Sequence, residues 1–368
     1  MNWYEIENID EVDSPSLVLY ESRMDSNIQK MISMVNGKTE RLMPHVKTNK
    51  TPEVVKRMVD AGIFNFKAST ISEAEIAAQA GAHEVLIAHQ LVGPKVKRFI
   101  KLIATYPKTK VSTIIDNLDS LEELNSLAAA QNIIIDFYID LNNGMDRSGI
   151  KFGNDLDNLI AQIPGAKNLD FKGLHIYDGH LHQKSFDERN SKVEEGFVEV
   201  EKLLAELETK VKGIKLIAGG TPTFTSHIKN KHRIASPGTC VFWDWGYNEI
   251  LEEQNFDAAA LLVTRVISKP TEGIVTLDLG HKSVAPENSI DKRVKFINLD
   301  NYELLSQSEE HGVLKVENWE SIKVGDVFYG IPYHICPTVN LHDELSVIKD
   351  NRKVETWQIT ARRRKINI

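Results

Sequence analysis

Lys47 stands at a point in the chain where a lysine side chain could do covalent chemistry. The preceding run, 42–46, has the loosely alternating apolar pattern of a strand, and Thr51-Pro52-Glu53 is typical of a helix start. Lys47 therefore ends a strand and could reach into a pocket there. An ε-amine in such a pocket can form an imine with a carbonyl compound. A solvated surface lysine is the ordinary alternative in a charged segment.

Two glycine-containing loops form a candidate anion site. Residues 219–221 read Gly-Gly-Thr and offer bare backbone amides and a hydroxyl just before Pro222, which suits the first turn of a helix. Amides and a helix dipole at such a turn point at an anion. Residues 238 and 239, Gly and Thr, supply a matching second loop. A tight turn that needs glycine is the alternative for this motif alone.

His334 and Cys336 are a possible metal-binding pair, because one position separates them. On a strand, alternate side chains point to the same face, so an imidazole and a thiolate could chelate one metal ion. A packed pair is the alternative, since buried cysteine behaves as a small hydrophobic residue. A thiolate ligand favours zinc.

Short apolar runs of β character alternate with amphipathic helical stretches up to about residue 242. The alternation indicates about eight βα units, the number that closes a parallel (β/α)8 TIM-type barrel. An open doubly wound sheet is the rival, but no Gly-x-Gly-x-x-Gly or Walker lysine loop follows a strand. The predicted barrel strands are 42–46, 64–68, 85–88, 111–115, 133–139, 171–177, 214–218 and 232–235.

The pattern changes after this region to strands without long helices between them, which predicts a C-terminal antiparallel β domain. Strand 16–20 precedes the barrel and could join either part. We expect residues 21–242 to form a cofactor-binding barrel, and 1–20 with 243–368 to form the β domain that carries the metal-binding segment. The predicted strands of the β domain are 260–267, 274–279, 294–298, 312–315, 326–329, 345–349 and 354–360.

Residues that follow the strands of a barrel converge at its C-terminal mouth. Lys47 follows the first predicted strand, Tyr177, His180 and His182 follow the sixth, and the two glycine loops follow the seventh and eighth. A lysine and a phosphate cradle at one mouth are the combination that holds pyridoxal phosphate. The sequence therefore predicts this cofactor, with small molecules as substrates.

Composition excludes several classes of protein. The chain has 368 residues and a net charge of -8, which argues against a nucleic-acid or anionic-membrane partner. Cys240 and Cys336 are its only cysteines, too few for a disulfide framework. The N-terminus has no apolar targeting segment and no run is long enough to span a bilayer. We expect a cytoplasmic protein.

These motifs resemble the fold-type III pyridoxal-phosphate enzymes, which have an alanine racemase-like fold, and within them the D-threonine aldolase and D-serine dehydratase group. The resemblance covers nearly the whole chain and implies a homodimer whose active sites form between subunits. It rests on residues 44–48, 143–149, 219–223, 237–242, 276–282, 307–312, 334–341 and 357–362.

The resemblance also assigns roles to individual residues. Lys47 would bind the cofactor covalently, and the metal at His334 and Cys336 would be zinc, manganese or magnesium. At Ser236 the chain departs from the racemase branch, where an arginine faces the pyridine nitrogen. The other cofactor-binding residues would be Arg147 at the phenolate, Tyr177 beside the ring, and Gly219, Gly220, Thr221, Gly238 and Thr239 at the phosphate.

The function that this implies is a lyase acting on D-3-hydroxy amino acids. In retro-aldol cleavage of D-threonine to glycine and acetaldehyde, His180 or His182 would take the β-hydroxyl proton. In the alternative, dehydration of D-serine or a related substrate, Lys47 would take the α-proton and the hydroxyl would leave by β-elimination. The two histidines favour the aldolase, whereas Cys336 as a ligand favours the dehydratase. A racemase and a non-catalytic cofactor-binding protein are further alternatives.

Overall fold

A computed structural model describes all 368 residues, and its contacts divide the chain into two compact units. The barrel unit comprises Met31–Lys47, Pro52–Gly238 and Arg363–Ile368; the β unit comprises Met1–Lys30, Thr48–Thr51 and Thr239–Arg362. Compared with the predicted division, the first part of helix α1 (Glu21–Met34) belongs to the β unit and the last residues to the barrel unit.

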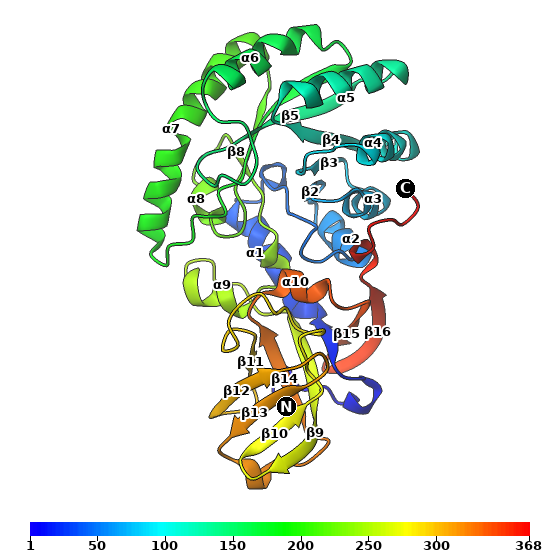
Figure 1. Cartoon of the computed structure of the whole chain (residues 1–368), viewed down its shortest axis with the longest axis vertical. Helices are drawn as coiled ribbons and strands as arrows, with labels where there is room; N and C mark the ends of the chain where they lie inside the picture. The colour runs from blue at the N-terminus through cyan, green and yellow to red at the C-terminus, as the bar shows by residue number, and fades with distance from the viewer. The chain divides into compact units, whose positions relative to one another are not determined.

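The barrel unit contains a seven-stranded parallel sheet whose strands follow one another in sequence order (Figure 1). The segment 42–46 lies between the sheet's two end strands, because isolated bridges join Leu42 to Ala235 and His45 to Lys67. It closes the barrel, and the predicted (β/α)8 fold is confirmed. The strands are β2 (Asn65–Ala68), β3 (Glu84–Ile87), β4 (Lys110–Ile115), β5 (Ile135–Leu141), β6 (Leu169–Ile176), β7 (Lys215–Ala218) and β8 (Arg233–Ala235).

Buried apolar side chains fill the barrel, and helices follow most of its strands. Local capping fixes some helix starts: the side chain of Thr70 accepts a hydrogen bond from Glu73 N, and that of Asn117 accepts one from Ser120 N. The interior cluster comprises Met43, Leu86, Ile114, Tyr138 and Ile217. The helices are α2 (Pro52–Asp60), α3 (Ile71–Gln79), α4 (Pro94–Thr105), α5 (Leu118–Ala130), α6 (Asn154–Gln162), α7 (Phe186–Lys210) and α8 (Phe224–His227).

The β unit contains a nine-stranded sheet with two short helices, α9 (Trp245–Ile250) and α10 (Ile335–Val339). Its pairs are antiparallel except β1 with β15, so the predicted antiparallel domain is a mixed sheet. The sequence does not predict strand β12, because only one of its side chains, Leu304, is buried. The strands are β1 (Ser16–Tyr20), β9 (Ala260–Thr271), β10 (Ile274–Leu277), β11 (Val294–Phe296), β12 (Tyr302–Gln307), β13 (Gly312–Val316), β14 (Val327–Pro332), β15 (Glu344–Lys349) and β16 (Arg352–Gln358).

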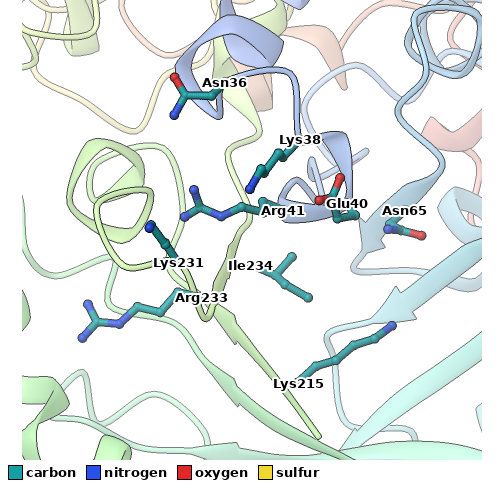
Figure 2. A pocket seen from close by; sticks show the side chains of 9 residues that line it. All are labelled: Asn36, Lys38, Glu40, Arg41, Asn65, Lys215, Lys231, Arg233 and Ile234. Carbon is teal, nitrogen blue, oxygen red and sulfur yellow. The ribbon is translucent and has the colours of Figure 1, made fainter. Parts of the chain in front are cut away.

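None of the helices combines the length and apolar character that crossing a bilayer requires. The cavity in Figure 2 lies at the amino-terminal ends of the barrel strands, opposite the mouth, and has a volume of about 420 Å³. Its lining is largely basic, with Lys38 and Lys231 as exposed members. Because it lies away from the mouth, it provides control positions for testing the mouth residues.

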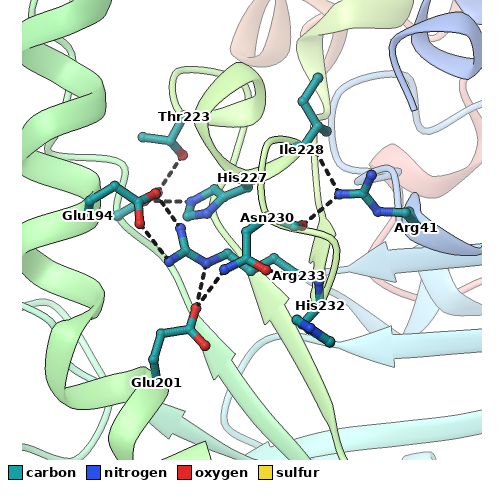
Figure 3. Close-up of polar contacts among 10 residues, drawn as sticks. Arg41, Glu194, Glu201, Thr223, His227, Ile228, Asn230, His232 and Arg233 are labelled. Atoms are coloured by element: carbon teal, nitrogen blue, oxygen red, sulfur yellow. Dashed lines mark hydrogen bonds and ion pairs between the residues drawn. The ribbon is translucent and has the colours of Figure 1, made fainter. Parts of the chain in front are cut away.

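Arg233 joins β8 to α7 near this end of the barrel (Figure 3). Its guanidinium donates to Glu194 at 2.8 and 3.1 Å and to Glu201 at 2.9 Å. The arginine side chain is 1% exposed, whereas the side chains of Glu194 and Glu201 are 49% and 34% exposed. Solvent therefore weakens the ion pairs, but the buried guanidinium depends on them.

We expect Arg233→Met to lower the free energy of unfolding by about 2 kcal/mol, because it removes charge-assisted hydrogen bonds while the carboxylates stay partly hydrated. Urea unfolding of the variant against wild type measures this difference. Lys231→Met is the matched control, since Lys231 is exposed, and it should unfold like wild type. A variant Arg233→Met as stable as wild type would contradict the prediction.

Candidate active site

Lys47 lies directly after the segment that closes the barrel. Hydrogen bonds from Met43 N to Ala235 O and from Val46 N to Lys67 O hold this segment between β8 and β2. The Lys47 side chain is half-buried, and its Nζ lies 5.5 Å from the centre of the Tyr177 ring. The predicted mouth lysine therefore faces an aromatic ring that follows β6.

The Tyr177 ring lies between glycines of two loops. A Cβ at Gly179 would lie 2.3 Å from the Tyr177 ring, and one at Gly220 would lie 2.9 Å from it. Gly219 has a φ of +70°, and a Cβ there would meet His227 and Thr223 at 2.4 and 2.5 Å. Side chains at these three positions would displace Tyr177 or distort the loop, so all three positions require glycine. We call Gly219 and Gly220, which follow β7, the glycine cradle.

The predicted phosphate loops are linked to each other, and some of their amides already have partners. Gly219 N donates to Ile176 O at 2.8 Å, and Gly238 N donates to Thr221 Oγ1 at 3.0 Å. Gly220 N makes only a long contact of 3.4 Å to Thr223 Oγ1. Thr239 belongs to the β unit, where its hydroxyl lies 3.5 Å from Cys336 Sγ.

Asp178 fixes the loop after β7 to the loop after β6, a role that sequence reasoning missed. Its carboxylate accepts a hydrogen bond from Thr223 Oγ1 at 2.6 Å and pairs with His227 Nε2 at 2.8 Å, and both Asp178 and His227 are fully buried. Burial alone would raise the pKa of Asp178, but His227 and Thr223 together hold it below its ordinary value. The Tyr177–Asp178 turn is therefore held rigidly against the glycine cradle.

We expect Asp178→Asn to lower the free energy of unfolding at neutral pH by about 3 kcal/mol, because the buried imidazole loses its carboxylate partner. The pKa of Asp178 is depressed in the folded chain, so its contribution is present above the unfolded carboxyl pKa. It is lost as the pH falls through the folded value. Urea unfolding across acidic and neutral pH should show a smaller difference from wild type in acid. Asp170→Asn, at an exposed position, is the control; a pH-independent difference would contradict the assignment.

Lys67 is the second residue that sequence reasoning missed. It lies on β2, is 2% exposed, and donates from Nζ to Gly219 O at 3.1 Å. Its Nζ lies 5.8 Å from the centre of the Tyr177 ring. The available signal was a charged residue within the apolar strand 64–68, where the barrel interior normally takes apolar side chains.

Arg147 lies on the loop after β5, and its Cζ is 4.5 Å from the centre of the Tyr177 ring. Two buried or half-buried acids hold this loop: Asp116 Oδ2 accepts from Gly149 N at 3.1 Å, and Asp140 Oδ2 accepts from Ser148 Oγ at 3.2 Å. Gln90 Nε2 donates to both carboxylates. The two acids therefore hold the loop in place, while the Arg147 side chain that it carries stays exposed.

The two candidate base histidines differ in their surroundings. His180 is half-buried, and its Nδ1 is buried with no hydrogen-bond partner. A Cβ at Gly144 would lie 3.7 Å from His180 Nε2, so the imidazole lies beside the loop that carries Arg147. His182 is exposed. His180 is therefore the histidine of this pair with an uncommitted ring nitrogen near the mouth.

His334 and Cys336 lie at a helix start rather than on a strand. Strand β14 ends at Pro332, His334 is the N-cap of α10, and Cys336 lies in its first turn. The geometric basis of the predicted pair is therefore wrong, although the side chains still meet. Burial by itself would lower the pKa of His334. A hydrogen bond with Cys336, together with nearby negative charges, outweighs burial, and the pKa of His334 is raised to about 9.

The surroundings of this pair include a carboxylate that binds one imidazole nitrogen. His334 Nδ1 lies 2.7 Å from Glu287 Oε1, so Nε2 is the nitrogen that a metal shared with Cys336 would take. Cys336 Sγ lies 3.1 Å from the hydroxyl of Thr48, the residue that follows Lys47 in the chain. No group of three His, Cys, Asp or Glu side chains is arranged to hold a metal. The pair alone would supply two ligands, so a metal held here would need water or substrate at its other positions.

Asp244 fixes the position of the His334–Cys336 turn. One carboxylate oxygen accepts from Tyr247 N at 2.9 Å and caps α9, and the other accepts from Ile335 N at 3.1 Å at the start of α10. Burial raises the pKa of Asp244 to about 6. The two short helices are thus held by one buried carboxyl group.

The barrel unit also fits pyridoxal phosphate. The cofactor is an aromatic ring that carries an aldehyde, a phenolate and a phosphate, and the mouth offers an amine, a guanidinium and a second aromatic ring around bare glycines. The Ser236 hydroxyl is buried and has no hydrogen-bond partner. A buried polar atom of this kind calls for a ligand or water.

Comparisons with known proteins agree with this architecture. A putative serine dehydratase domain matches residues 259–348, and the alanine racemase N-terminal domain matches residues 20–244. The chain is 26% identical to a 3-hydroxy-D-aspartate aldolase of Paracoccus denitrificans, over 96% of this chain and 92% of that protein. It is 22% identical to a D-threo-3-hydroxyaspartate dehydratase of a Delftia species, over 94% of this chain and 97% of that protein.

The structure of a D-threonine aldolase from Filomicrobium marinum superposes with a TM-score of 0.86 at 26% identity, covering 97% of this chain and 98% of that one. The alanine racemase match spans more than half of the present chain, and it includes Lys47 and every predicted cofactor residue of the barrel. The chain belongs to the family of proteins with an alanine racemase N-terminal domain.

Proposed function

We propose that this protein is a pyridoxal-phosphate-dependent lyase that cleaves D-3-hydroxy amino acids, such as D-threonine, into glycine and an aldehyde. The observation that carries the proposal is Lys47 at the barrel mouth, facing Tyr177 beside a glycine cradle. The aldolase relatives, each 26% identical over nearly the whole chain, support the reaction class.

The cofactor's binding residues would be those already described. Lys47 would hold the cofactor through its amine, Arg147 would pair with the phenolate, and Gly220 and Thr221 would bind the phosphate. Bound pyridoxal phosphate supplies an electron sink for a carbanion at the substrate's α-carbon. Tyr177 would lie beside the cofactor ring, since the glycines on either side leave room for the tyrosine ring at this place.

Proton transfer at the β-hydroxyl would fall to His180. Its Nδ1 is buried and uncommitted, and the ring lies beside the loop of Arg147. His182 is exposed and stays the second candidate. A base near the β-oxygen is what carbon–carbon bond cleavage requires, because the hydroxyl becomes the carbonyl of the aldehyde product.

We also propose a divalent metal at His334 and Cys336, with zinc, manganese and magnesium as candidates. Such a metal would supply a Lewis acid for the β-hydroxyl group. Glu287 would orient the imidazole through Nδ1, as carboxylates do at many metal-bound histidines. The thiolate ligand favours zinc among the three.

Dehydration by β-elimination is the second candidate function, and Cys336 is the observation that favours it. In that reaction Lys47 would take the α-proton and the hydroxyl would leave as water. The two dehydratase relatives, each 22% identical, support this alternative.

Product analysis decides between the two. Purified protein supplied with pyridoxal phosphate and a divalent metal should convert D-threonine to glycine and acetaldehyde. Formation of 2-oxobutyrate and ammonia would identify a dehydratase, and optical inversion alone would identify a racemase. D-Serine and 3-hydroxy-D-aspartate extend the test to the substrates of the relatives. Absence of every product would overturn the lyase proposal.

We also propose that the protein is a homodimer and that it is located in the cytoplasm. The first rests on the resemblance, and the second on the composition and the small number of cysteines. Light scattering of the purified protein at several concentrations should give the mass of two chains. A monomer mass in a catalytically active sample would contradict the dimer.

A further inference from the structure

Lys67 is a buried cation of the barrel unit that the proposed reaction has not used. Its side chain is 2% exposed, and its single hydrogen bond, from Nζ to Gly219 O at 3.1 Å, satisfies one of the three ammonium donors. It forms no ion pair in the structure. A buried ammonium is costly unless it is paired or hydrogen-bonded, so the two remaining donors call for an acceptor.

The nearest buried carboxylates have other partners. Asp178 is committed to Thr223 and His227, and Asp140 to His175, Gln90 and Ser148. Burial, and then the positive charge of Lys47, lower the pKa of Lys67 to about 7. The ammonium is thus poorly compensated within the chain.

Three cationic side chains surround one aromatic ring. The Tyr177 ring centre lies 5.5 Å from Lys47 Nζ, 5.8 Å from Lys67 Nζ and 4.5 Å from Arg147 Cζ. Like charges gathered around one ring repel each other unless a ligand with negative or electron-rich groups lies among them. Lys67 therefore belongs to the ligand site at the mouth.

Lys67 and Ser236 lie at the same level of the barrel. Gly219 directly follows β7, Ser236 directly follows β8, and Ser236 N donates to Ala218 O. The Ser236 hydroxyl is buried without a partner, and the Lys67 ammonium is bonded to the neighbouring Gly219 carbonyl. Serine carries no charge, whereas Lys67 brings a cation to this level from β2, which only the segment 42–46 separates from β8.

We propose that Lys67, together with Ser236, binds the pyridine-nitrogen side of the cofactor ring from inside the barrel. This inference rests on the proposed function, because it requires pyridoxal phosphate at the mouth. The phosphate would lie further along the loop, at Gly220 and Thr221, and Lys67 points instead to the carbonyl that precedes them. An ammonium donates to an unprotonated ring nitrogen and holds it in that form.

The test compares cofactor affinity among lysine variants by equilibrium dialysis with pyridoxal phosphate. Lys67→Met should lose at least about tenfold in affinity and shift the absorption maximum of the bound cofactor. Lys67→Arg should keep affinity within about threefold of wild type, since it restores a cationic donor. Lys38→Met is the matched control at the far end of the barrel and should match wild type in both measurements.

Binding of inorganic phosphate distinguishes residues that bind the cofactor's phosphate group from residues that bind its ring. Lys67→Met should keep the wild-type thermal stabilisation by phosphate while losing affinity for the complete cofactor. Equal loss of both would place Lys67 at the phosphate and overturn the assignment. Lys67→Gln provides a second neutral variant should the Met variant unfold at a lower temperature. Cofactor binding and absorption identical to wild type in both neutral variants would overturn this proposal alone, whereas wild-type protein that binds no cofactor would overturn the proposed function as well.

Discussion

Lys47→Ala is expected to lose at least about 10³-fold in kcat/KM, because the amine that would hold the cofactor covalently is removed. In the alternative dehydration the variant would also lack the base for the substrate's α-proton, so the loss should be large for either reaction. Arg147 cannot replace the amine, since a guanidinium stays protonated. Product formation from D-threonine at saturating cofactor measures the effect.

Lys47→Arg separates charge from nucleophilicity. It keeps a cation beside Tyr177 but lacks a free amine, so it should be as inactive as Lys47→Ala. Lys38→Met again serves as the control, because it removes a lysine far from the mouth. Activity of Lys47→Arg near that of wild type would contradict the role of Lys47.

His334→Ala is expected to lower kcat by at least about 100-fold and to reduce the bound metal of the purified protein to a small fraction of one equivalent. The physical reason is the donor set: the chain offers one imidazole nitrogen and one thiolate, with no group of three ligand side chains arranged for a metal. Removal of one of two ligands leaves a site too weak to retain the ion. Metal analysis together with steady-state rates measures both effects.

The controls for this prediction separate metal loss from misfolding. His311→Ala removes an exposed histidine of the same unit and should change neither metal content nor rate. Glu287→Gln should cost about tenfold in metal affinity, because it weakens the orientation of the imidazole without removing a ligand. Full turnover of wild-type protein in the presence of a strong chelator would contradict the metal's role.

Local patterns were sufficient to predict the barrel and the position of its lysine. The segment 42–46 and the helix start at Pro52 are short-range features: the first closes the barrel through isolated bridges rather than as a regular strand, and α2 begins at Pro52 as predicted. The glycines before Pro222 form the loop after β7, but the helix that follows begins only at Phe224. The mouth could be predicted because consecutive parallel strands place their ends together.

Contacts between distant parts of the chain could not be predicted in this way. Lys67 meets Gly219 across 152 positions, and Asp178 meets His227 across 49. Such pairs depend on which side chains point into the barrel, which no periodicity shows. The turn at His334 did carry a local signal: Pro337 has no backbone N–H, so it suits the first turn of a helix and argues against a strand.

The most direct test of the account is the position of the covalent bond to the cofactor. Purified protein loaded with pyridoxal phosphate should be yellow, and borohydride reduction followed by peptide mass analysis should find the added pyridoxyl group on Lys47. Lys67 should remain unmodified, since its nitrogen is bonded to the Gly219 carbonyl. A colourless protein, or a label on Lys67 or any other lysine instead, would contradict the account.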